Sequence, residues 1–286
     1  MEECLKSLPP QLLKWVGNKQ RIARQIVDAF PLDFGVYYEP FLGSGAVMGA
    51  LAPNCAVGSD VLPALIRIWD RLVHAPEELI SDYDRYRAQI DKGVDKRCVY
   101  RRALDDYNLS NDDRAFVFLS RACYGGVIRF RKADGYMSTP VGAHMPISTE
   151  SFRKRVYSWR ERVVGATFDC MDYREAFELP QSGDLVYCDP PYVDTQKILY
   201  GAQSFDFDDL IGCIDDAKSR GVRVAMSIDG SKQGGRKWVD LDLPRNLFES
   251  EVRISVGKSM LRRFQLAGEV LDGEEVVDRL LLTYGL

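Results

Sequence analysis

The chain has 286 residues, of which 46% are hydrophobic and 28% charged, so it can bury a large core without disulfides or metals. Its net charge of -4 excludes a protein that coats nucleic acid through overall positive charge, but it allows a local basic face. No apolar run approaches the roughly 18 residues of a membrane span, and no apolar N-terminal segment predicts a secretory signal.

The first part of the chain is expected to hold one loop before a helix and two loops at strand ends. A loop at residues 13–19, Leu-Lys-Trp-Val-Gly-Asn-Lys, precedes a helical pattern that Pro31 ends. A strand at residues 36–38 then runs into Glu-Pro-Phe-Leu-Gly-Ser-Gly at residues 39–45, where the glycines allow a tight turn and close approach of a ligand. The loop matches neither GxGxxG nor a P-loop. A second strand, residues 55–59, ends at Asp60, which suits either ribose hydroxyls or the cap of the next helix.

The middle of the chain reads as helical and then basic. Apolar spacing predicts helices at residues 63–73, 76–90, 95–109 and 112–123. Residues 124–142 resemble a hairpin in which arginines alternate with aromatic residues, and a basic helix follows at 149–163. A basic two-stranded ribbon can enter the major groove of DNA, where arginine binds guanine. The alternative is an ordinary solvent-exposed hairpin.

Strands and helices alternate through the rest of the chain. Strands are expected at residues 167–173, 184–188, 222–228, 250–256 and 279–284, and a helix at 206–219. This alternation predicts an α/β protein with a largely parallel sheet and helices on both faces.

The strand at 184–188 ends in Asp189-Pro190-Pro191-Tyr192. Open α/β sheets bind ligands at such carboxyl ends. The prolines have no amide hydrogen, so their extended backbone presents fixed carbonyl acceptors, and Tyr192 adds a flat ring. This combination suits a planar group that carries an amine, such as adenine. Taken alone, the motif equally fits a strand followed by a Pro-Pro turn.

Four motifs occur together in a fixed order, and a basic hairpin lies between the last two. They are Lys-Trp-Val-Gly-Asn-Lys, Glu-Pro-Phe-Leu-Gly-Ser-Gly, the strand-end Asp60 and Asp-Pro-Pro-Tyr. Over residues 12–284 the chain resembles the Dam-type adenine-N6 DNA methyltransferases, which use S-adenosylmethionine. The resemblance implies a class I methyltransferase (Rossmann-like) fold, with a mainly parallel seven-stranded sheet and an antiparallel C-terminal hairpin. It implies a catalytic domain of residues 1–62 and 164–286 and a mostly helical target-recognition region of residues 63–163.

The resemblance also implies roles for particular residues. Those expected to bind the cofactor are Trp15, Lys19, Phe41, Gly43, Gly45, Asp60 and Asp189. Those expected to hold and methylate the adenine are Asp189, Pro190, Pro191 and Tyr192. Those expected to contact DNA are Arg121, Tyr124, Arg129, Arg131 and Lys132. No metal is expected, because the chemistry needs none. The seven cysteines also lack CxxC spacing, and the chain has only two histidines to complete a zinc site.

The recognition segment departs from the family pattern. Ser120-Arg121 stands where the family has Asn-Arg, Tyr124-Gly125-Gly126 where it has Tyr/Phe-Asn-Gly, and Met-Ser-Thr-Pro at 137–140 where it has Phe-Asn-Val-Pro. The resemblance therefore leaves the recognition sequence open, GATC included. Expected partners are double-stranded DNA and, in function, a cognate restriction endonuclease. A monomer in a bacterial or phage-infected cytoplasm is expected, with free thiols and no membrane attachment.

Other functions remain compatible with the motifs. Methylation of cytosine N4, or of adenine in RNA, would use the same acceptors. Cytosine-C5 chemistry is disfavoured, because no Pro-Cys dipeptide occurs. A nicotinamide-dependent oxidoreductase would leave Asp-Pro-Pro-Tyr without a role, and a DNA-binding module without catalysis would not need it.

Overall fold

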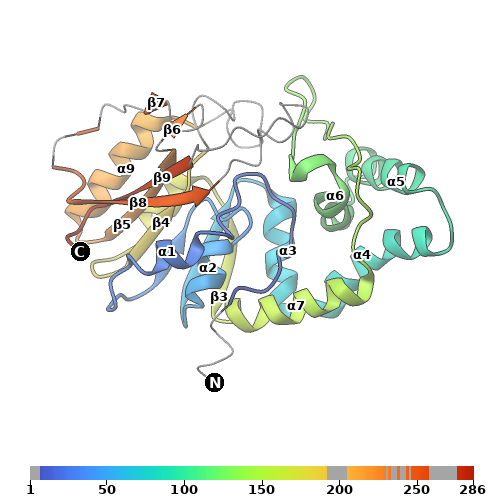
Figure 1. The fold of residues 1–286 in the computed structure, drawn as a ribbon, viewed down its shortest axis with the longest axis horizontal. Coiled ribbons are helices and arrows are strands. Elements are labelled where there is room, and N and C mark those ends of the chain that lie inside the picture. Colours follow the sequence, from blue (N-terminus) through green and yellow to red (C-terminus); the bar gives the residue numbers. More distant parts are fainter. Residues whose placement is uncertain are drawn as a thin grey trace.

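The computed structural model describes residues 7–191, 205–229, 231–232, 237–238, 243–244, 246–257 and 276–286, and Figure 1 shows a sheet beside a mainly helical region. Seven strands form one sheet in the order β3-β2-β1-β4-β5-β9-β8. The strands from β3 to β5 in this order are parallel, and β9 runs antiparallel to both β5 and β8. They are β1 (Tyr37–Glu39), β2 (Ala56–Asp60), β3 (Ala166–Cys170), β4 (Leu185–Cys188), β5 (Arg223–Asp229), β8 (Ser250–Gly257) and β9 (Val276–Leu282). The short strands β6 (Ser231–Lys232) and β7 (Lys237–Trp238) pair separately.

Helices cover both faces of the sheet. Successive residues of a strand point to opposite faces, and apolar side chains on each face are buried against helices. Leu185 and Tyr187 belong to one buried cluster, with residues of α1 (Ala23–Val27), α2 (Ala46–Leu51) and α3 (Pro63–His74). Val186 and Cys188 belong to a second cluster, with residues of α8 (Tyr173–Glu178) and α9 (Phe207–Ser219). This double coverage explains why β4 is apolar at every position.

The remaining helices lie to one side of the sheet in Figure 1 and share its first core. They are α4 (Pro76–Asp91), α5 (Lys96–Leu109), α6 (Phe116–Ala122) and α7 (Thr149–Val163). Helix α3 contacts β2 and β3 as well as α4, α6 and α7, so it joins the sheet to the helical region.

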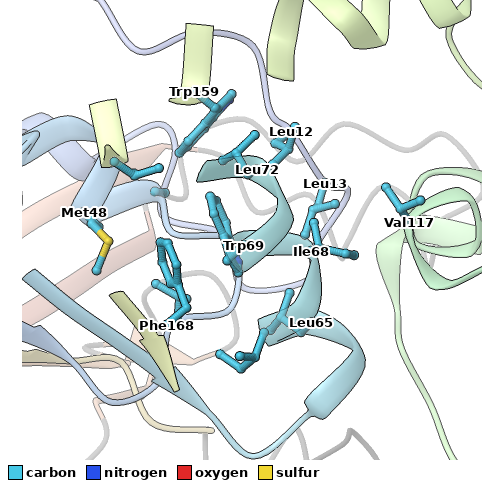
Figure 2. Close-up of a cluster of buried hydrophobic side chains, with 14 of the residues drawn as sticks. Leu12, Leu13, Met48, Leu65, Ile68, Trp69, Leu72, Val117, Trp159 and Phe168 are labelled. Atoms are coloured by element: carbon cyan, nitrogen blue, oxygen red, sulfur yellow. The ribbon is translucent and has the colours of Figure 1, made fainter. Parts of the chain in front are cut away.

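Trp69 of α3 is the centre of this junction. Figure 2 shows its ring between Trp159 of α7 and Phe168 of β3. The Trp69 ring stacks on Phe168 with a centroid separation of 5.8 Å and meets Trp159 edge-on at 5.7 Å. Its indole nitrogen also donates a hydrogen bond of 3.2 Å to the carbonyl of Gly43. The helical region therefore packs directly on the loop that follows β1.

The structure confirms the seven-stranded sheet and its antiparallel C-terminal pair, but some boundaries differ from expectation. The segment 112–123 is split into a 3-10 turn at Asp113–Ala115 and helix α6. The strand expected to reach residue 173 ends at Cys170, because Asp172 caps α8, a helix that was not predicted from the sequence. Among the described residues, no helix combines the length and apolar composition needed to cross a bilayer.

Replacement of Trp69 tests this junction. We expect Trp69→Ala to lower the free energy of unfolding by about 3–5 kcal/mol, because it removes a fully buried ring. Trp69→Phe keeps an aromatic ring against Phe168 and should cost less. Urea denaturation of both variants measures the difference. Equal losses, or a loss below about 1 kcal/mol for the alanine variant, would contradict a central packing role.

Candidate active site

A pocket opens where β2, β1 and β4 end, at the shared carboxyl edge of the parallel sheet. The space between its walls, counted out to the open solvent, is about 940 Å³. The lining comes from the N-terminal loop, the loop after β1, and the residues that follow β2, β3 and β4. Residues far apart in sequence therefore meet at one crevice.

Asp60 ties the glycine loop to the end of β2. Its carboxylate accepts hydrogen bonds from the backbone nitrogens of Gly43, at 3.1 Å, and Leu62, at 3.2 Å. Gly43 has a φ of 45°, and a Cβ there would lie 2.9 Å from the indole nitrogen of Trp15. Only glycine lets the loop approach Trp15 so closely. Asp60 thus fixes the backbone that forms one wall of the pocket.

A buried lysine holds the end of β4 in place. The Lys19 ammonium lies 3.2 Å from Asp189 Oδ1 and 3.1 Å from Asp278 Oδ2. Lys19 and Asp278 are each 6% exposed. Asp189 lines the pocket together with Pro190 and Pro191, whereas Asp278 comes from β9 behind it. The ion pairs join the N-terminal loop to two strands of the sheet.

Glu39, at the end of β1, is a second buried carboxyl group in the pocket wall. It accepts hydrogen bonds from the Tyr37 hydroxyl, at 2.7 Å, and the Met48 backbone nitrogen, at 2.9 Å. Burial raises the pKa of Glu39 from 4.5 to about 8, against the effect of these hydrogen bonds, and the nearby Asp189 carboxylate raises it further. Glu39 is therefore mainly protonated at neutral pH.

Three aromatic rings, those of Phe41, Tyr173 and Phe205, also line the pocket. Phe41 stacks on Tyr173 with a centroid separation of 5.4 Å, and Phe205 packs edge-on against Phe41 at 6.0 Å. Asp172 precedes Tyr173 in the lining and caps α8 in a reciprocal arrangement with Glu175. No role in the site was predicted for Asp172, Tyr173 or Phe205. The spacing Asp-x-x-Glu at 172–175 is a capping-box signal for the start of a helix. This signal could have shown that the predicted strand ends before Asp172.

The pocket is acidic. The described lining residues include the carboxyl groups of Glu39, Asp60, Asp172 and Asp189, and a single cation, Lys19. Lys19 already pairs with two carboxylates. Such a site favours a cationic ligand with a flat ring system and disfavours the pyrophosphate of a dinucleotide. This charge balance argues against a nicotinamide cofactor.

The structure places most of the predicted cofactor and catalytic residues in this pocket. The predicted residues that line it are Trp15, Lys19, Phe41, Gly43, Asp60, Asp189, Pro190 and Pro191. Gly45 is absent from the lining, and a Cβ there would lie 2.8 Å from the Trp69 ring, so its small size serves packing. Tyr192 lies outside the described residues.

Arg121 occupies a different environment from the DNA surface that the sequence predicted for it. Its side chain is buried, and its guanidinium donates to the carbonyls of Gln11, at 2.9 Å, and Leu12, at 2.7 Å. Burial lowers the pKa of Arg121 to about 10, and the charge of Arg155 lowers it further. A DNA contact would require Arg121 to leave these carbonyls, so we assign it to holding the N-terminal loop.

The other predicted DNA residues lie on or near the hairpin. Its two arms pair through bridges between Phe130 and Met137 and between Cys123 and Val141. At the tip, the Arg131 guanidinium binds Asp134 through two hydrogen bonds and lies 4.2 Å from the centre of the Tyr136 ring. The members that reach the surface are Tyr124, Arg131 and Lys132, with Arg129 half-buried.

The base of the hairpin contacts the cofactor-side loop. The backbone nitrogen of Val16 donates to the carbonyl of Gly126 at 3.2 Å. Gly126 has a φ of 71°, and a Cβ there would lie 2.8 Å from the carbonyl carbon of Lys14. The segment on either side of Trp15 is therefore packed directly against the candidate DNA-reading element.

Comparisons with known proteins agree with this geometry. Residues 15–260 match the family model described as D12 class N6 adenine-specific DNA methyltransferase. The "Retron Ec67 DNA adenine methylase" of Escherichia coli is 31% identical over 227 residues, covering 76% of each chain. A "DNA adenine methylase" of Vibrio cholerae is 28% identical over 75% of this chain and 79% of its own. The "Type II methyltransferase M1.LlaDCHI" of Lactococcus lactis is 26% identical over 80% of this chain and 84% of its own.

The pKa of Glu39 makes stability depend on pH. Between pH 4.5 and about 8 the unfolded carboxyl ionises while the folded one stays protonated, so the native protein loses stability as pH rises. We expect Glu39→Gln, which keeps an acceptor for Tyr37 and Met48, to gain stability relative to native protein across this window, reaching a few kcal/mol. Urea denaturation at several pH values measures the margin. A margin independent of pH would contradict the raised pKa.

Proposed function

Because this chain belongs to the family of D12 class N6 adenine-specific DNA methyltransferases, we propose that it binds S-adenosylmethionine in the strand-end pocket and methylates adenine flipped out of duplex DNA. The observation that carries the residue assignment is the Asp189-Pro190 pair in the lining of an acidic, aromatic pocket, with Lys19 ion-paired to Asp189. A carboxylate and a fixed carbonyl at that point suit an exocyclic amine.

The donor set of the pocket fits S-adenosylmethionine. Trp15, Phe41 and Tyr173 offer flat surfaces for an adenine ring, and Asp60 offers oxygens to ribose hydroxyls. The ionised carboxylates favour a sulfonium cation. When bound, this cofactor supplies a methyl group already activated for transfer. Asp60 also keeps the glycine loop in register through Gly43, so the same residue shapes the site and lines it.

Asp189 and Pro190 act on the amine that receives the methyl group. The N6 lone pair of adenine is delocalised into its ring, so the amine is a poor nucleophile. A carboxylate oxygen of Asp189 and the carbonyl of Pro190 accept the two N6 hydrogens and stabilise the positive charge that develops on nitrogen. Asp189 need not be a strong base, because N6–H becomes acidic only as the new bond forms. Lys19 keeps the Asp189 carboxylate aimed at the amine.

The target adenine must leave the duplex to reach Asp189. Extrusion costs a few kcal/mol of unstacking and unpairing. An aromatic ring beside Pro191 would recover part of this cost, which is the role we propose for Tyr192. Methylation of cytosine N4 would use the same acceptors, so recognition of the base itself belongs to contacts beyond Asp189 and Pro190.

The hairpin is the proposed DNA-reading element, within a recognition region of residues 63–163. Arg129 and Lys132 form no ion pair within the described parts of the chain, whereas Asp134 and Tyr136 preorganise Arg131. A basic ribbon of this kind fits a major groove. Tyr124 is exposed on it, and the buried Arg121 holds the N-terminal loop through the carbonyl of Leu12. Helix α3 also packs on the sheet, so it joins the recognition region to the proposed catalytic domain.

Replacement of the strand-end carboxylate tests the proposed chemistry. We expect Asp189→Ala to abolish methyl transfer, because the amine loses its charged acceptor, while the protein remains folded and binds duplex DNA. Tritiated methyl transfer and a DNA-binding assay measure both properties. Asp215→Ala, an exposed aspartate on α9, is the matched control and should retain native activity. Native transfer by Asp189→Ala would refute the assignment.

Replacement of Arg129 tests base reading. If its guanidinium binds one guanine through two hydrogen bonds, Arg129→Ala should relax specificity at that base pair by about 1–3 kcal/mol. Lys132→Ala, at the exposed tip, should instead weaken binding equally on all sequences. Transfer rates on a panel of single-base variants of the preferred site measure both effects. A uniform loss for Arg129→Ala would mark a phosphate contact.

A further inference from the structure

Asp278 is a buried carboxylate that the proposed reaction does not yet use. It lies in β9, is 6% exposed and is not among the residues that line the pocket. We propose that Asp278 is a positioning residue for methyl transfer, which acts through Lys19 to fix the catalytic carboxylate of Asp189. This inference rests on the proposed function of Asp189.

The geometry places Lys19 as the link. Its ammonium lies 3.1 Å from Asp278 Oδ2 and 3.2 Å from Asp189 Oδ1, so one cation contacts carboxylates from two different strands. A lysine ammonium is a compact charge on a flexible four-carbon stem. With Asp189 as its sole carboxylate partner, the stem could swing toward the pocket. The second ion pair, to Asp278, holds the ammonium at a fixed position beside Asp189.

Charge gives Asp278 a second effect. Paired with Asp189 alone, Lys19 would cancel the negative charge that stabilises the developing cation on N6. Shared between Asp189 and Asp278, the same ammonium leaves the group of three with a net charge of -1. Asp189 therefore keeps negative charge with which to stabilise the cation that develops on the amine.

An alternative role for Asp278 is only to compensate the buried charge of Lys19. Removal of one partner from a buried ion pair is destabilising in any case. The two roles differ in what happens at folded active sites. A compensating residue changes the amount of folded protein, whereas a positioning residue changes the rate at each folded site. They differ also in whether the effect passes through Lys19.

A double-mutant cycle separates these roles. The variants are Asp278→Asn, Lys19→Gln and the double variant, measured by single-turnover transfer at saturating S-adenosylmethionine and duplex DNA and normalised to folded protein. We expect Asp278→Asn to slow transfer roughly 10- to 100-fold, as for a small displacement of a reacting group, with cofactor affinity changed far less. In the Lys19→Gln background, Asp278→Asn should have no further effect.

Each contrary result overturns the proposal. Native transfer per folded Asp278→Asn site would leave Asp278 a structural residue. A change confined to the cofactor dissociation constant would place it in cofactor binding. If the rate effects of Asp278→Asn and Lys19→Gln multiply in the double variant, Asp278 does not act through Lys19.

If Asp278→Asn does not fold, Asp278→Glu keeps the charge and displaces it by one methylene, and it should slow transfer while retaining cofactor affinity. Native transfer by Asp189→Ala in the same assay would instead refute the proposed function.

Discussion

The ammonium of Lys19, buried between Asp189 and Asp278, is the interaction on which the site depends. It joins three segments that are remote in sequence: the N-terminal loop, the end of β4 and β9. A buried charge is tolerated only when it is paired, so the loop, the turn after β4 and the C-terminal strand pair must be assembled together. The position of β9 between β5 and β8 is thus part of the active site, although β9 does not line the pocket.

The contact between the hairpin and the N-terminal loop links DNA reading to the pocket. Arg121 binds the carbonyls of Gln11 and Leu12, and Gly126 binds Val16, so the recognition region contacts the loop on both sides of Lys14. Trp15 continues this connection to the glycine loop at Gly43. A shift at the base of the hairpin must therefore move the backbone that carries Trp15 and Lys19, because close-packed interiors transmit displacements.

Much of the fold and part of the site could be predicted from local sequence patterns. The carboxyl ends of parallel strands meet at one edge, so Asp60 and Asp189 were expected to share a crevice, and they line the same pocket. Asp278 was missed because its pairing spans 259 residues and depends on where β9 enters the sheet. The pKa of Glu39 could not be predicted, since it depends on burial beneath α2. The burial of Arg121 was not predicted, because a run of basic residues does not reveal which of them is buried.

The central claim is that the acceptors at the end of β4 receive the exocyclic amine of adenine. The most direct measurement is to incubate the chain with duplex DNA and S-adenosylmethionine labelled in the methyl group, digest the DNA to nucleosides, and identify the labelled product by mass spectrometry. The expected product is N6-methyl-2′-deoxyadenosine, and Asp189→Ala should form none. Label on cytosine N4, or equal labelling by Asp189→Ala, would contradict it.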